Sequence, residues 1–88
     1  MHRMIRLGIR GMTCRRCAER IREHLQEDSG IVAVEISLGR GVGEVQFDAE
    51  VTDTARIVNH RVFRTEFPVR WKTGRVQVHR YSAELVMG

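Results

Sequence analysis

Several residue types that mark large classes of protein are scarce in this 88-residue chain. There are only 2 cysteines and 1 proline, which argues against a disulfide framework and against a disordered tail. No segment approaches the roughly 18 consecutive apolar residues of a membrane helix, and the charged N-terminal segment lacks the apolar stretch of a secretory signal. We therefore expect a cytoplasmic protein with no direct membrane insertion.

The length and charge of the chain limit its function further. Eighty-eight residues form one domain with a modest core and leave no room for a cleft between two domains, so we expect no enzyme. The formal net charge is +4, but the basic residues are spread along the chain and accompany no nucleic-acid-binding motif. We expect no nucleic-acid partner. The positive charge indicates either a basic solvated surface or docking onto an acidic partner protein, whose encounter it would speed.

Hydrophobic periodicity predicts the elements of the fold. Alternating apolar residues indicate half-buried strands, and apolar residues at helical spacing indicate amphipathic helices. The glycine-rich turn at 39–43 makes the strands on either side of it an antiparallel hairpin. The pattern predicts a strand over 4–9, a helix from about 15 that ends at 28–30, strands over 31–38 and 44–48, a helix capped by Thr52 or Asp53, and a fourth strand over 69–71.

This order of elements, βαββαβ, predicts an α+β fold of the ferredoxin-like type. Two helices cover one face of a four-stranded antiparallel sheet. Residues 1–71 then form the domain, and residues 72–88 form a C-terminal extension. Within the extension we expect a hairpin loop at 72–74 with Gly74 in the left-handed region, an extra strand over 75–81, and then a tail.

Both cysteines lie where the first strand gives way to the first helix, in Gly11-Met12-Thr13-Cys14-Arg15-Arg16-Cys17. Two residues separate the sulfurs, so a loop that enters the first turn of a helix can bring both thiolates onto one ion. The two arginines and the helix N-terminus favour the thiolate, which is the metal-binding form. In the reducing cytosol such a pair indicates a metal or redox site rather than a disulfide. We therefore assign Cys14 and Cys17 as the metal-binding residues.

The heptapeptide at this strand-helix junction resembles the motif of the heavy-metal-associated domain, the module of small copper chaperones, metal-exporting P-type ATPases and mercury-carrier proteins. The resemblance covers roughly Arg3 to Trp71. It implies that Cys14 and Cys17 ligate a soft ion on a solvent-exposed loop, and that Met12 packs beneath this loop. It also implies that ligand exchange passes the ion to a docked partner, either a metal-transporting P-type ATPase or another heavy-metal-associated domain. We expect a monomer, which a shared ion could bridge into a dimer.

Two departures from the family pattern concern the surroundings of the loop. Family members commonly have Gly-Tyr or a lysine before the last strand, where this chain has Glu66-Phe67-Pro68. Phe67 can cover the site but has no hydroxyl group to reach the sulfurs, and an aromatic residue followed by proline resembles the mercury carriers. The second departure is the extension after Trp71, near which many members end.

The donor set ranks the metals. Two thiolates suit ions that accept near-linear coordination, namely Cu(I) and Hg(II), whereas Zn(II) normally takes four ligands. Arg15 and Arg16 would offset the negative charge of a Cu(I) bis-thiolate. Thr13 stands where zinc-preferring relatives often place an acidic residue. We rank Cu(I) above Hg(II), and both above Zn(II) and Cd(II).

The four histidines, His2, His24, His60 and His79, are predicted to be surface or structural residues and not ligands. His24 lies two helical turns beyond Cys17, which is about 10 Å along the axis. A second function also fits the cysteine pair, that of a thiol-disulfide redox protein. Against it, the chain lacks the tryptophan before the cysteines and the Gly-Pro between them that redox sites of the thioredoxin type usually carry.

Overall fold

The first strand of the sheet is β1 (His2–Arg10), and burial alternates along it. Ile5, Leu7 and Ile9 lie in the core, and the residues between them stay partly exposed. The computed structural model describes residues 2–12 and 14–87, with only the backbone of Met87. The comparison of Thr13 with zinc-preferring relatives therefore falls outside the described residues. The other elements are α1 (Arg15–Gln26), β2 (Ile31–Ser37), β3 (Val42–Asp48), α2 (Thr54–Val58), the 3₁₀ turn η1 (Arg61–Phe63), β4 (Glu66–Arg70), β5 (Val76–Arg80) and β6 (Ser82–Met87).

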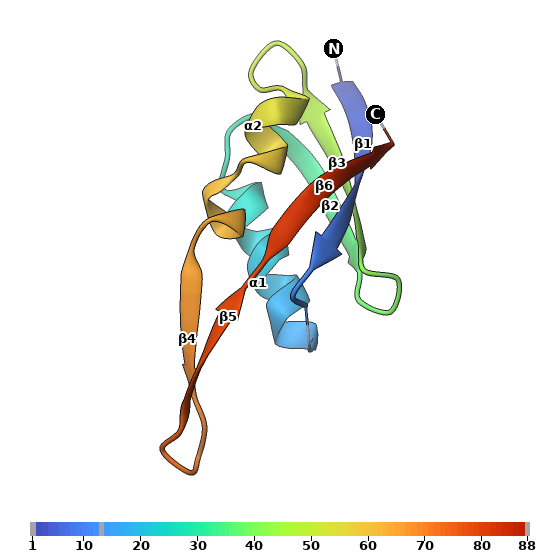
Figure 1. Cartoon of the computed structure of the whole chain (residues 1–88). Helices are drawn as coiled ribbons and strands as arrows, with labels where there is room; N and C mark the ends of the chain where they lie inside the picture. The colour runs from blue at the N-terminus through green and yellow to red at the C-terminus, as the bar shows by residue number, and fades with distance from the viewer. Residues whose placement is uncertain (1, 13, 88) are drawn as a thin grey trace.

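Four strands form one antiparallel sheet in the order β2-β3-β1-β6. The helices α1 and α2 lie on one face of this sheet, as Figure 1 shows. Apolar side chains from both layers form the core. This arrangement confirms the predicted α+β fold, with a four-stranded antiparallel sheet and two helices on one face. Within residues 2–12 and 14–87, no helix has the length and apolar character needed to cross a membrane.

The helix α1 buries the four residues that its periodicity predicts, Cys17, Ala18, Ile21 and Leu25. Complete burial of a side chain such as Ile21 or Leu25 stabilises the fold by about 1.5–3 kcal/mol. Because the core is close-packed, a residue in this stripe cannot shift without disturbing its neighbours. The burial of Cys17 in the same stripe therefore fixes the position of one of the two thiols.

The second helix is shorter than its pattern predicts. Asp53 caps α2 as expected, since its carboxylate accepts a hydrogen bond from the backbone N–H of Arg56 at 2.8 Å. The helix has only 5 residues, and the chain then continues as the η1 turn. Helical spacing predicts a buried stripe of Ala55, Val58 and Val62. Val62 is buried and Val58 partly buried, but Ala55 is exposed, and Ile57 is buried instead.

The last strand of the sheet lies later in the chain than the sequence pattern predicts. The pattern places this strand at 69–71 and a tail after residue 81, but β6 is the strand that pairs with β1. Its register sets Arg10 opposite Ser82 and Ile9 opposite Ala83. The expected division at residue 71 therefore does not separate the sheet from an extension. Local alternation could not reveal this, because β6 is an edge strand whose described side chains are mostly exposed.

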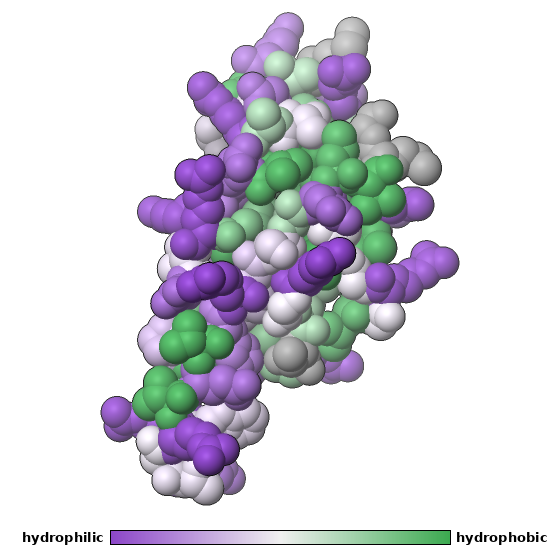
Figure 2. Space-filling model, viewed as in Figure 1, coloured by the Kyte–Doolittle hydropathy of each residue, from purple (hydrophilic) through white to green (hydrophobic). Residues whose placement is uncertain are grey.

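The strands β4 and β5 form a separate hairpin outside the main sheet. The predicted loop at 72–74 and the extra strand after it are confirmed, since Gly74 has a φ of +85° and β5 pairs with β4. The hairpin projects from one end of the molecule, and β5 runs directly on toward β6 (Figure 1). Figure 2 shows hydrophobic side chains along this projection, where Val76 and Val78 are exposed.

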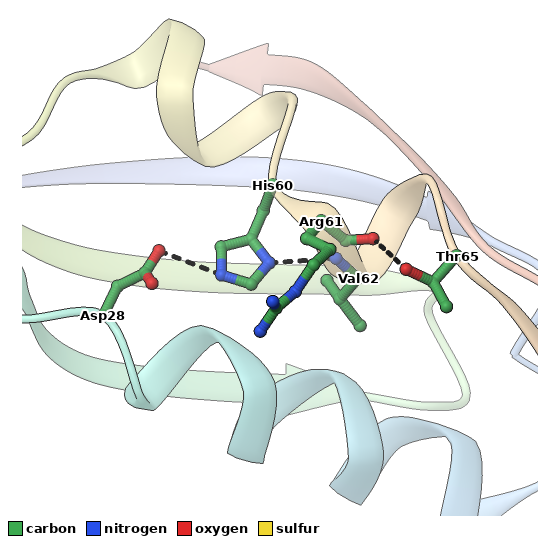
Figure 3. A network of polar contacts seen from close by, with 5 residues as sticks. All are labelled: Asp28, His60, Arg61, Val62 and Thr65. Carbon is green, nitrogen blue, oxygen red and sulfur yellow. Dashed lines mark hydrogen bonds and ion pairs between the residues drawn. The ribbon is translucent and has the colours of Figure 1, made fainter.

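His60 links the second helical region to the end of α1 and has a structural role (Figure 3). The ring is 8% exposed, its Nδ1 accepts a hydrogen bond from the backbone N–H of Val62 at 3.0 Å, and its Nε2 lies 2.9 Å from Oδ2 of Asp28. Because Nδ1 accepts, the neutral ring carries its proton on Nε2 and donates it to Asp28. Burial lowers the pKa of His60, and the Asp28 carboxylate opposes this effect.

We expect the free energy of unfolding to fall as the pH drops below about 6.5, the ordinary pKa of histidine. The unfolded chain takes up a proton at His60 before the folded chain does, so this stabilisation is complete above pH 6.5 and is lost as the pH falls toward the lowered folded-state pKa. Titration of His60 changes the free energy of unfolding by at most about 1.4 kcal/mol per pH unit. Urea unfolding at several pH values measures the slope. His60→Phe should reduce it and the exposed His2→Ala should not; an unchanged slope in His60→Phe would contradict the assignment.

Candidate functional site

The two cysteines stand at the N-terminus of α1, where β1 and its loop deliver the chain. Cys14 is the N-cap residue, and its carbonyl accepts hydrogen bonds from the N–H groups of Cys17 and Ala18. The two Sγ atoms are 3.6 Å apart, and no disulfide joins them. One ion with metal–sulfur bonds of about 2.3 Å can bridge sulfurs up to about 4.6 Å apart, so both sulfurs can reach the same ion.

The loop that holds the cysteines lies directly against the chain between β5 and β6. Gly11 has a φ of +97°, and a Cβ at this position would lie 2.2 Å from the carbonyl oxygen of Arg80. Glycine is therefore required here for two reasons: it adopts the positive φ without strain, and it has no Cβ to clash with this oxygen. Met12 is partly buried and packs against the core, as the family resemblance implies. Backbone and core contacts thus fix the loop on its N-terminal side.

The two cysteines differ in exposure. Cys14 is exposed, whereas Cys17 is 1% exposed and belongs to the core. The expectation of a solvent-exposed loop is therefore wrong for Cys17. The reason is the amphipathic pattern of α1, in which Cys17 is the first residue of the buried stripe. Another molecule reaches this pair from the side of Cys14.

Tyr81 occupies the place before the last sheet strand that the sequence pattern gave to Phe67. It is fully buried, and its hydroxyl accepts a hydrogen bond from Nη1 of Arg20 at 2.9 Å. Burial first, and then the Cys17 side chain, raise the pKa of Tyr81 to about 12, while Arg20 opposes this rise. The phenol keeps its proton at neutral pH and can donate it toward the Cys17 sulfur. The chain therefore does place a hydroxyl group beside the cysteine pair.

Phe67 of β4 attaches the hairpin to α1 next to the cysteines. Its ring centroid is 5.6 Å from the ring centroids of His24 and Tyr81, and Cζ of Arg20 lies 4.9 Å from the Phe67 centroid. An aromatic pair contributes about 0.5–1.5 kcal/mol beyond its buried area, and an exposed cation–π contact contributes about 0.5–1 kcal/mol. Phe67 thus packs on Arg20 and Tyr81, and its expected covering of the cysteine pair stays a prediction.

His79 of β5 is a candidate that the sequence pattern did not reveal. Its Nδ1 lies 3.4 Å from Sγ of Cys17, although the two residues are 62 positions apart. In the hairpin His79 is the cross-strand partner of Phe67, so both side chains lie on the face directed at α1. The sequence signal that could have revealed it is the turn at Gly74, because that turn sets the register that pairs residues 67 and 79.

The fold and the cysteine pair define a small ferredoxin-like domain with Cys-x-x-Cys at the start of its first helix. The sequence profile of the heavy-metal-associated domain matches residues 6–60, which is more than half of the chain. The chain belongs to the heavy-metal-associated domain family. The matched region ends before the β4–β5 hairpin, which begins at Glu66.

Similar curated proteins are much longer than this chain. Copper-transporting ATPase 2 of Rattus norvegicus is 43% identical over 49 residues, which are 56% of this chain but 3% of that protein. The protein of the same name from Homo sapiens is 37% identical over 51 residues, which are 58% of this chain and 4% of that protein. The chain therefore spans only a few per cent of the length of these relatives.

Solved structures extend the likeness across nearly the whole chain. The N-terminal domain of a potential copper-translocating P-type ATPase from Bacillus subtilis, in its Cu(I)-loaded state, is 20% identical with a TM-score of 0.73, over 99% of this chain and 90% of that one. The mercury-bound form of MerP, a periplasmic protein of the bacterial mercury detoxification system, is 17% identical with a TM-score of 0.62, over 96% of this chain and 99% of that one. At these identities the likeness shows the fold.

The raised pKa of Tyr81 can be measured directly, because Tyr81 is the only tyrosine of the chain. We expect the absorbance of tyrosinate near 295 nm to appear with a midpoint of about pH 12 in the folded protein. In denaturing urea the midpoint should return to about 10, the ordinary value. Far-UV circular dichroism at each pH verifies that the fold persists, and a midpoint near 10 in the folded chain would contradict the burial of the phenol beside Cys17.

The difference in exposure predicts unequal reactivity of the two thiols. We expect iodoacetamide to alkylate Cys14 at least about tenfold faster than Cys17 in the metal-free reduced protein. Trypsin cleaves after Arg15 and Arg16, so mass spectrometry can follow the two cysteines on separate peptides. In urea the two rates should converge; equal rates in the folded chain would show that Cys17 is accessible.

Proposed function

We propose that this chain binds a soft metal ion through Cys14 and Cys17 and passes it to a partner protein by ligand exchange. The observation that supports this most strongly is the pair of reduced thiols whose sulfurs lie 3.6 Å apart at the N-terminus of α1, in a chain of the heavy-metal-associated family. The function is binding and transfer, without a catalysed reaction. The metal ion is the cargo.

Cu(I) is the first candidate for this ion, Hg(II) the second, and Zn(II) or Cd(II) come below both. Thiolate ligands select soft ions, and two of them satisfy an ion that accepts near-linear coordination. Such coordination requires the sulfurs to move apart by about 1 Å from their present 3.6 Å, which the exposed Cys14 can provide. Copper also stands in the name of the relative that is 43% identical.

Transfer proceeds by attack of a partner thiolate on the bound ion before either cysteine leaves. The exposed Cys14 detaches first, because its side chain can move without disturbing the core. The buried Cys17 then holds the ion until the partner's second thiolate has bound. The difference in exposure between Cys14 and Cys17 gives the exchange this order.

The partner is a copper-transporting P-type ATPase or another heavy-metal-associated domain. Arg10, Arg15 and Arg16 are exposed around the loop, so an acidic surface on the partner would speed docking. We place this exchange in the cytoplasm, where reducing conditions keep both thiols reduced. The chain acts as a monomer, and an ion shared through Cys14 can bridge two copies.

Replacement of either cysteine should abolish tight 1:1 binding of Cu(I). We expect Cys14→Ser and Cys17→Ser to weaken the affinity by at least about 100-fold, because one thiolate cannot satisfy the ion. Competition against a chromogenic Cu(I) chelator under anaerobic, reducing conditions measures this, together with a count of the thiols that the ion protects. Retention of the affinity in Cys14→Ser, whose exposed side chain leaves the core intact, would refute the two-thiolate site.

Two controls accompany this titration. Met12→Leu keeps the packing beneath the loop but removes the thioether, so it should leave the affinity for Cu(I) unchanged. Titration with Hg(II) and Zn(II) tests the ranking of the metals. If no ion protects the thiols, the redox alternative becomes the better interpretation of the cysteine pair.

A further inference from the structure

The β4–β5 hairpin brings a polar nitrogen to the cysteine pair from outside the region that matches the family profile. One face of the hairpin carries Phe67 and His79 opposite each other, and this face lies against α1. The other face carries the exposed ion pair of Glu66 and Arg80. The two faces of the hairpin therefore differ: the imidazole of His79 is directed at the Cys17 sulfur, and the ion pair is directed at solvent.

Both ends of the contact between His79 and Cys17 are held in place. Cys17 is 1% exposed in the core of the molecule, and the His79 side chain is partly buried. Phe67, directly across the hairpin from His79, packs on Arg20 and Tyr81 and so fixes the position of this pair of strands. The 3.4 Å distance from Nδ1 to Sγ is thus determined by packed elements on both sides.

We propose that His79 is a third donor to the ion that Cys14 and Cys17 bind, an inference that rests on the proposed function. Among residues 2–12 and 14–87, no three His, Cys, Asp or Glu side chains already form a complete set for a metal. The set is completed when Nδ1 exchanges its contact with Sγ of Cys17 for a bond to the ion. Each thiol releases its proton to solvent, and the neutral imidazole gives the lone pair of Nδ1 while its proton stays on Nε2.

Addition of an imidazole nitrogen to the two sulfurs should raise the affinity of the site for some ions more than for others. Imidazole is a good ligand for copper and zinc, and Zn(II) needs more than two donors. Hg(II) is satisfied by two thiolates and gains little from a third, weaker donor. His79 should therefore matter most for Zn(II), clearly for Cu(I), and least for Hg(II), so that three ions test one residue.

The direct test uses the full-length, ¹⁵N-labelled chain with one equivalent of Cu(I), added without oxygen, and long-range ¹H–¹⁵N spectra of the four histidine rings. We expect the Nδ1 resonance of His79 to shift on binding while the ring signals of His2, His24 and His60 stay in place. An unshifted His79 in a protein whose two thiols are protected by Cu(I) overturns the proposal and leaves the two-thiolate function standing. Failure of Cu(I) to protect the thiols at all overturns both.

Affinities of variants give an independent measurement. We expect His79→Ala to weaken binding of Zn(II) and Cu(I) by at least about tenfold, and binding of Hg(II) by less than threefold. His79→Gln keeps a side chain that can form hydrogen bonds but lacks the imidazole, so it should fail to restore the affinity. Recovery in His79→Gln would show that the residue only positions Cys17. His2→Ala is the control, since His2 is exposed on β1 and takes no part in the contacts of the hairpin with α1, and it should change none of the three affinities.

Discussion

Pairing of β1 with β6 is the contact on which the cysteine site depends. The register that sets Arg10 opposite Ser82 brings residues 79–81 against the loop that enters α1. Gly11 then meets the carbonyl of Arg80, with no space for a side chain between them. Sheet register, and not loop flexibility, therefore places the Tyr81 phenol next to Cys17. A slip of one residue would turn the side chains of β6 to the opposite faces and remove these contacts.

A buried thiolate is costly unless donors surround it, and the structure provides them around Cys17. The backbone N–H groups in the first turn of α1 lie at this end of the helix, where the helix dipole favours negative charge. The phenol of Tyr81 keeps its proton and accepts from Arg20, so its own hydrogen is available for the sulfur. Cys14, in contrast, is exposed to water. The site thus combines one thiol stabilised by the fold with one that can move.

The sequence pattern predicts the parts of this arrangement that local periodicity controls. Burial of Ile5, Leu7 and Ile9 along β1 and of four residues along α1 follows from spacing alone, and so does the cysteine pair at their junction. Periodicity fails where a long-range pairing decides the outcome. The strand β6 is an edge strand with mostly exposed side chains, so its own sequence pattern does not show that it pairs with β1. The contact of His79 with Cys17 depends on the hairpin register, which the turn at Gly74 predicts, and on the pairing of β6 with β1, which local spacing does not reveal.

A third donor carried by a separate hairpin suits a protein that must both hold and release an ion. The strands β4 and β5 form their own two-stranded sheet, and Phe67 is the hairpin residue whose ring packs on α1. Contacts of this kind contribute about 0.5–1.5 kcal/mol each. This is far less than the free energy needed to pull apart the strands of the main sheet. Local opening of the hairpin would therefore cost less free energy than opening of the main sheet. Withdrawal of His79 in this way would leave the ion on two thiolates, the state that a partner's thiolate attacks, without disturbing the buried Cys17.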